Sequence, residues 1–95
     1  MKSNDRPLGD VIREIMRKYK LEEHLEETKL IDNWSAVCGP MIAGHTTSIN
    51  IRDHILFVRV DSAALRQELQ YNRESLLSKL NRTAGKEIIR DIVFR

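Results

Sequence analysis

Residues 55–69 read ILFVRVDSAALRQEL, and the hydrophobic period of this stretch changes partway along. Leu56, Val58 and Val60 alternate with other residues, which predicts a half-buried strand. Ser62 is a good helix N-cap, and the leucines after it recur at helical spacing. A strand that leads directly into a helix indicates a domain that mixes the two kinds of element.

A second strand and a closing strand are predicted on either side of this stretch. Apolar residues alternate with polar ones over 48–52, and Asp53-His54 then forms a two-residue hairpin loop. The helix after the second strand runs to Gly85, a residue type that ends helices well. Residues 87–94 resemble a last strand.

The N-terminal part is predicted to be helical. An apolar stripe predicts a first helix over residues 7–19, after a polar tail over residues 1–6. A second stripe predicts a helix over about 21–41, with a break near Thr28 and an interruption at Gly39.

Length and composition favour a single α+β domain over residues 7–95. The chain has 95 residues, of which 41% are hydrophobic and 32% charged, and this suits one small soluble domain. The predicted order is α-α-β-β-α-β, with helices packed on one face of a small three-stranded, mostly antiparallel sheet. No apolar run could cross a membrane and no secretory signal is visible, so we expect a cytoplasmic protein.

The sequence offers little support for catalysis. Cys38 lies on an apolar stripe and is interpreted as a small buried hydrophobe. His24, His45 and His54 fall in three different elements, so no metal site is expected. The acidic stretch 22–32 is interpreted as a solvated helix face. We expect no enzyme activity and no cofactor.

Basic residues are the main functional candidates, and two interpretations of them stay open. They could stabilise helix ends and keep the domain dissolved, or they could contact phosphates in a salt-sensitive way. The candidate nucleic-acid-binding residues are Arg13, Arg17, Arg52, Arg59, Arg66, Arg73, Lys79, Arg82 and Lys86.

Two aromatic residues are given different roles by their positions. Phe57 points away from the face that Leu56 and Val58 share, so it is a candidate for stacking on a base or binding a partner. Trp34 lies in the middle of a helical stripe and is expected in the core.

A longer pattern resembles a known family. Residues 34–46 read WSAVCGPMIAGHT, in which Gly39 follows Trp34 by five positions and His45 follows Gly39 by six. Together with ILFVRVDSAALRQEL, LLSKLNRTAG and the terminal DIVFR, this pattern resembles the DciA-type bacterial replicative-helicase loaders.

The resemblance implies a KH-like domain without the GxxG loop of true KH domains. It also implies delivery or activation of a DnaB-type hexameric helicase, with affinity for single-stranded DNA. Trp34, Gly39 and His45 match the signature positions of the family, where we expect mainly structural roles. Many relatives carry a basic extension beside this domain, and functions of that extension are not expected of residues 1–95.

These observations predict a non-enzymatic adaptor that binds the replicative helicase and, weakly, single-stranded DNA. Two alternatives stay open. The same KH-like surface could bind RNA, or the chain could be a structural homodimer that pairs through a sheet edge or through Phe57.

Overall fold

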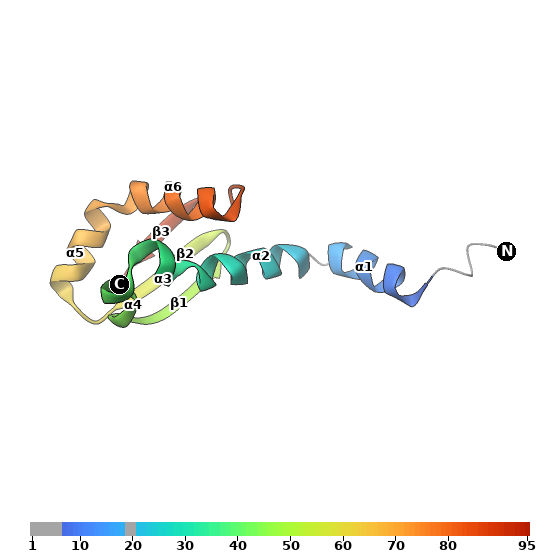
Figure 1. The fold of residues 1–95 in the computed structure, drawn as a ribbon, viewed down its shortest axis with the longest axis horizontal. Coiled ribbons are helices and arrows are strands. Elements are labelled where there is room, and N and C mark those ends of the chain that lie inside the picture. The colour runs from blue at the N-terminus through green and yellow to red at the C-terminus, as the bar shows by residue number, and fades with distance from the viewer. Residues whose placement is uncertain (1–6, 19–20) are drawn as a thin grey trace.

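A computed structural model describes residues 7–18 and 21–95 of the chain. The predicted polar tail over residues 1–6 and the predicted end of the first helix at residue 19 lie outside the described residues. The elements in chain order are α1 (Leu8–Lys18), α2 (Leu21–Asp32), α3 (Trp34–Cys38), α4 (Pro40–Gly44), β1 (Thr46–Arg52), β2 (Ile55–Val60), α5 (Ala63–Tyr71), α6 (Arg73–Ala84) and β3 (Asp91–Phe94) (Figure 1).

The three strands form a mixed sheet in the order β1-β2-β3. β1 and β2 are antiparallel, with Ile51 opposite Leu56, and β2 and β3 are parallel, with Leu56 opposite Ile92. The parallel pair follows from the connection, because α5 and α6 carry the chain across the sheet between β2 and β3. The predicted α+β architecture and element order are confirmed.

A two-residue turn joins β1 to β2, as predicted. Asp53 and His54 both have positive φ, at 54° and 65°, which is the backbone of a type I′ turn. The carbonyl oxygen of His54 accepts a hydrogen bond from the N–H of Arg90 at 2.7 Å, so the turn is also tied to the segment that precedes β3.

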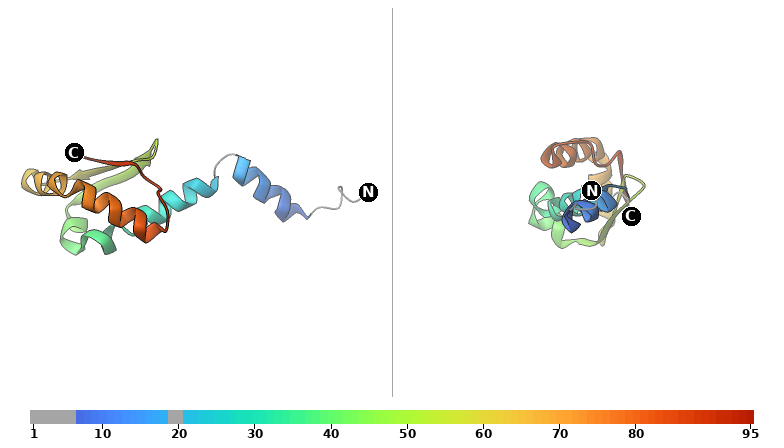
Figure 2. Two further views of the ribbon diagram at one scale, coloured as in Figure 1. Left: turned by 90° about the horizontal axis from the view of Figure 1, so that it is seen from above. Right: turned by 90° about the vertical axis from the view of Figure 1, so that its right-hand side faces the viewer.

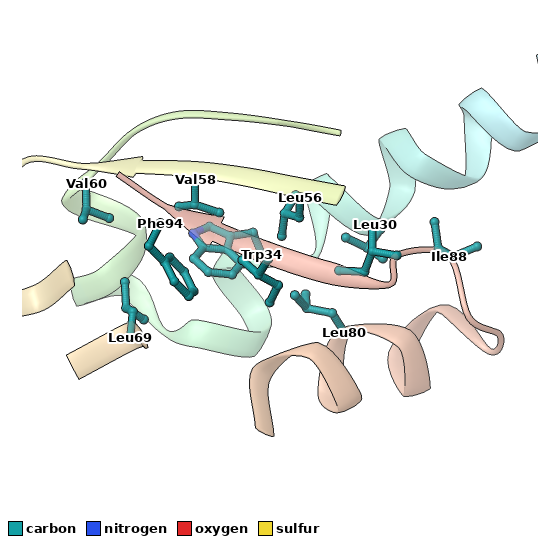
Figure 3. Close-up of a cluster of buried hydrophobic side chains, with 11 residues drawn as sticks. Leu30, Trp34, Leu56, Val58, Val60, Leu69, Leu80, Ile88 and Phe94 are labelled. Carbon is teal, nitrogen blue, oxygen red and sulfur yellow. The ribbon is translucent and has the colours of Figure 1, made fainter. Parts of the chain in front are cut away.

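The core lies between the sheet and the helices. Leu56, Val58 and Val60 of β2 have exposed fractions of at most 3%, and Trp34 packs among them from the helical side (Figure 3). The rings of Trp34 and Phe94 are 6.5 Å apart and inclined by 40°, within the usual range for aromatic pairs. The expectation that Trp34 belongs to the core is confirmed, since its exposed fraction is 4%.

The helices after residue 20 cover one face of the sheet, and the other face is open (Figure 2). The first helix differs: α1 continues beyond α2 and away from the sheet (Figure 1). Its predicted apolar stripe is exposed, with 74% of Leu8 and 49% of Ile12 accessible. Among the described residues, no helix is both long and apolar enough to span a membrane.

The single long helix predicted after Ser62 is wrong, because the chain forms two helices with Asn72 between them. Ser62 does cap α5, and its side chain accepts a hydrogen bond from the N–H of Leu65. At Asn72 the side-chain amide donates to the carbonyl of Glu68 at 3.0 Å. Asparagine side chains compete with backbone groups for hydrogen bonds in this way. The helix axis changes direction between α5 and α6 (Figure 1).

The predicted break near Thr28 is also misplaced. Thr28 lies inside α2, where its hydroxyl donates to the carbonyl of His24 at 3.0 Å, and the break falls at Asn33 instead. The interruption at Gly39 is confirmed. Its φ of 91° is costly for a residue with a Cβ, and it separates α3 from α4.

The last strand begins later than predicted, at Asp91 rather than at residue 87. The reason is the side chain of Asn81 on α6. Its Oδ1 accepts hydrogen bonds from the N–H groups of Ile88 and Ile89 at 2.8 and 3.1 Å, and its Nδ2 donates to the carbonyl of Ile89 at 2.8 Å. The backbone of these two buried isoleucines is therefore satisfied by a side chain and not by a neighbouring strand.

Replacing Asn81 by alanine is expected to lower the free energy of unfolding by about 2–4 kcal/mol, because two N–H groups lose their acceptor beside buried side chains. Urea unfolding followed by circular dichroism measures this loss. The control is Asn72→Ala, which removes one exposed hydrogen bond and is expected to cost less than about 1 kcal/mol. Equal losses in the two variants would contradict the role given to Asn81.

Candidate nucleic-acid interface on the open face of the sheet

The alternation of β2 decides which side chains reach the open face of the sheet. Leu56, Val58 and Val60 face the core, so Phe57 and Arg59 face away from it. The expected outward orientation of Phe57 is confirmed, and its side chain is half-buried among its neighbours.

Phe57 is central on this face because of the strand register. Asn50 of β1 lies opposite it on one side, and Val93 of β3 lies opposite it on the other. The ladder extends one residue past β3, since the N–H of Arg95 donates to the carbonyl of Val58 and the carbonyl of Arg95 accepts from Val60. Arg95 is thereby placed on the open face beside Arg59.

Two guanidinium groups lie over the ring of Phe57. Cζ of Arg52 is 5.7 Å from the ring centroid, and Cζ of Arg95 is 4.9 Å from it. Both distances fall within the range of cation–π attraction. Among the described residues, neither arginine has a carboxylate within ion-pair distance. The sheet therefore presents an aromatic ring and two uncompensated positive charges within one small area.

Sequence reasoning identified two of these three residues and missed Arg95. Arg52 and Phe57 are among the candidates named from the sequence, whereas Arg95 lies one residue past the predicted last strand and was not named. The signal that could have found it is the alternation of that strand. Ile92 and Phe94 face the core, so Val93 and Arg95 must share the opposite face with Phe57.

Three of the candidate cations are bound to carboxylates. The pairs are Arg73–Asp91 at 3.0 Å, Lys86–Glu26 at 2.7 Å and Arg13–Asp10 at 2.8 Å. All of these pairs are partly exposed, so each contributes little to stability, but each also offsets the charge that a phosphate would meet.

Arg52 and Arg59 lie on the sheet, and the remaining candidate cations lie on helices, separate from Phe57. Arg82 donates to the hydroxyl of Ser78 at 3.2 Å, while Lys79 on α6 and Arg17 on α1 are exposed. Arg66 is half-buried on α5, and its Nε has no hydrogen-bond partner in the described part of the chain. It lines a shallow hollow of about 310 Å³ beside Phe94.

Two of the three signature residues, Trp34 and His45, form hydrogen bonds that link separate elements of the fold. Trp34 Nε1 donates to Thr46 Oγ1 at 3.0 Å, and that hydroxyl donates to the carbonyl of Ile42 at 2.8 Å. The chain of bonds joins the core to α4 and to the start of β1. His45 Nδ1 lies 2.8 Å from Asp61 Oδ1, across the two ends of the hairpin.

The cysteine is not suited to nucleophilic chemistry. Burial raises the pKa of the Cys38 thiol from 9.0 to about 12, although the nearby charge of Lys79 acts in the opposite direction. The thiol is therefore protonated at neutral pH, and the thiolate is the reactive form. This agrees with its interpretation as a small hydrophobe.

The chain is similar to one protein family and to several proteins of mycobacteria. A family model described as "Dna[CI] antecedent, DciA" matches residues 7–94. The chain is 31% identical over 83 residues to a UPF0232 protein of Mycolicibacterium paratuberculosis, which covers 87% of this chain and 46% of that protein. It is 30% identical over 86 residues to a UPF0232 protein of Mycobacterium tuberculosis, covering 90% of this chain and 46% of that one. The chain thus spans slightly less than half the length of these relatives.

Proposed function

The chain belongs to the DciA family, and we propose from this premise that it is a non-enzymatic adaptor of DNA replication in the cytoplasm. In this proposal it binds a DnaB-type replicative helicase through one surface and single-stranded DNA through another. The observation that carries the DNA-binding half is the pair of arginines over Phe57 on the open face of the sheet.

The chemistry of this face suits a single strand. A base that is not paired can stack on an aromatic ring or on the plane of a guanidinium group, and such stacking tolerates any sequence. Arg52 and Arg95 lie at opposite edges of the sheet, at the end of β1 and after β3, so their charges can reach phosphates on both sides of a base that stacks on this face. In a duplex the faces of the bases are hidden by their neighbours.

The face is suited to weak binding. Its single aromatic ring can stack with only one base at a time. Arg59 adds a third exposed cation beside Arg95, which can contact a phosphate. Lys79 and Arg82 on α6 form a separate basic ridge on the helical side of the domain. The ridge is a rival contact surface for the strand, and variants can tell the two surfaces apart.

The helicase-binding half of the proposal uses α1. Leu8, Val11, Ile12 and Ile15 form an apolar stripe on this helix, and all four side chains are exposed. A helix with such a stripe binds by inserting it into an apolar groove of a partner. Because α1 lies away from the sheet, the two surfaces can be occupied at the same time (Figure 1).

Substitutions at the open face are expected to weaken binding to a labelled single strand in fluorescence anisotropy. Phe57→Ala removes the stacking surface and is expected to weaken binding about tenfold. Arg52→Gln and Arg95→Gln are each expected to flatten the slope of log affinity against log salt by ~0.7 if each contacts one phosphate.

The matched control is Arg82→Gln, which removes an exposed arginine from α6 and is expected to leave affinity and slope nearly unchanged. The opposite pattern, with loss at Arg82 and none at Arg52 or Arg95, would assign the strand to the helical ridge. Competition by an RNA strand of the same sequence tests the RNA alternative. Clear preference for RNA would contradict the proposal, because only RNA offers 2′-hydroxyl groups.

The α1 surface is expected to be needed for binding to a DnaB-type helicase. Ile12→Ser places a hydroxyl in the middle of the apolar stripe and is expected to weaken helicase binding in surface plasmon resonance by tenfold or more. Ile12 is 49% exposed, so the fold is expected to tolerate the change. Arg17→Gln, on the opposite side of α1, is the control. Unchanged helicase binding by Ile12→Ser would remove α1 from the account.

A further inference from the structure

Three side chains from two distant parts of the sequence meet where α2 passes the β1–β2 turn. Glu23 and Glu27 are one helical turn apart on α2, and His54 belongs to the turn. One ligand atom from each of the three lies within 4.8 Å of the others. Sequence spacing gave no sign of this group, because the fold alone brings the histidine to the glutamates.

The orientation of the imidazole calls for a cation, either a proton or a metal ion, between His54 and Glu23. Nδ1 of His54 lies 3.3 Å from the carbonyl oxygen of Ile88, which can only accept a hydrogen bond, so this nitrogen carries the proton. In the neutral ring Nε2 then holds a lone pair, and it faces Oε1 of Glu23 at 3.1 Å. A lone pair and a carboxylate repel each other at this distance unless a proton or a metal ion lies between them.

We propose that Glu23, Glu27 and His54 bind a divalent transition-metal ion of the zinc type. Zinc takes one imidazole nitrogen and two carboxylate oxygens readily, with bonds of about 2.0–2.2 Å. Tetrahedral ligands at that distance are ~3.3 Å apart, close to the 3.1 Å between His54 and Glu23. Calcium and magnesium are less suitable, since they require six or more oxygen ligands.

The surroundings hold the histidine in place for this role. A histidine that binds a metal usually donates its other ring N–H to a carbonyl or carboxylate, as His54 does to Ile88. The backbone of His54 is held as well, by the hydrogen bond from the N–H of Arg90. The carboxylates are half-buried on a helix and need a rotamer change at most to close on the ion.

A bound ion would link the N-terminal half of α2 to the hairpin. The same half of α2 already contacts the α6–β3 connection through Lys86 and Glu26, at 2.7 Å. The ion would therefore add a second fixed point for the helix that leads to α1. This inference does not depend on the binding of DNA or of a helicase.

Zinc titration of the chelator-treated full chain tests the site by isothermal calorimetry. We expect one ion per chain, a rise in melting temperature with zinc, and binding at least tenfold weaker in both Glu27→Gln and His54→Asn. Asparagine is used at position 54 because it tolerates positive φ. The control is His24→Gln, which removes an exposed histidine from the same helix and is expected to bind zinc normally.

The Glu27→Gln variant distinguishes a metal ion bound at this site from a proton on His54. A protonated His54 needs Glu23 alone, so its pairing is not affected by loss of Glu27, whereas a metal ion loses one of three ligands. The proposal is overturned if millimolar zinc gives no saturable binding. It is overturned equally if binding persists unchanged in both Glu27→Gln and His54→Asn, since the ion would then be held elsewhere.

Discussion

The alternation of side chains along β2 determines which residues build the core and which reach the open face of the sheet. Burying Leu56, Val58 and Val60 against the helices forces Phe57 and Arg59 onto the opposite face. The parallel pairing with β3 then places Val93 and Arg95 beside them, and the antiparallel pairing with β1 adds Asn50 and Arg52. One face of the sheet holds the core together, so the other is free to bind.

Much of the fold could be predicted from the sequence because local signals were strong. The alternation over 55–60, the Ser62 cap and the Gly39 interruption all depend on nearest neighbours in the chain, and the structure shows each of them. Two of the errors came from side chains that form hydrogen bonds with the backbone. The side chain of Asn72 divides the one predicted helix into two, and the side chain of Asn81 shortens the last strand. Hydrophobic periodicity does not reveal such hydrogen bonds.

The candidate site was less predictable, because it depends on register. Phe57 and Arg52 could be named from alternation within a hairpin, but Arg95 reaches Phe57 through a parallel pairing that follows two helices. Charge pairing was equally hidden. Lys86 and Arg73 were indistinguishable from Arg52 in the sequence, yet carboxylates from other elements bind the first two. The meeting of His54 with α2 is of the same kind, a contact made by the fold alone.

We propose that a DNA strand binds on the open face of the sheet. The most direct measurement is the mapping of amide chemical shifts by NMR while a short oligothymidine is added to the labelled chain. We expect the largest changes at Phe57 and at its neighbours on that face, Asn50, Val93 and Arg95. Changes confined to residues 79–86 of α6, with the strands unaffected, would contradict it.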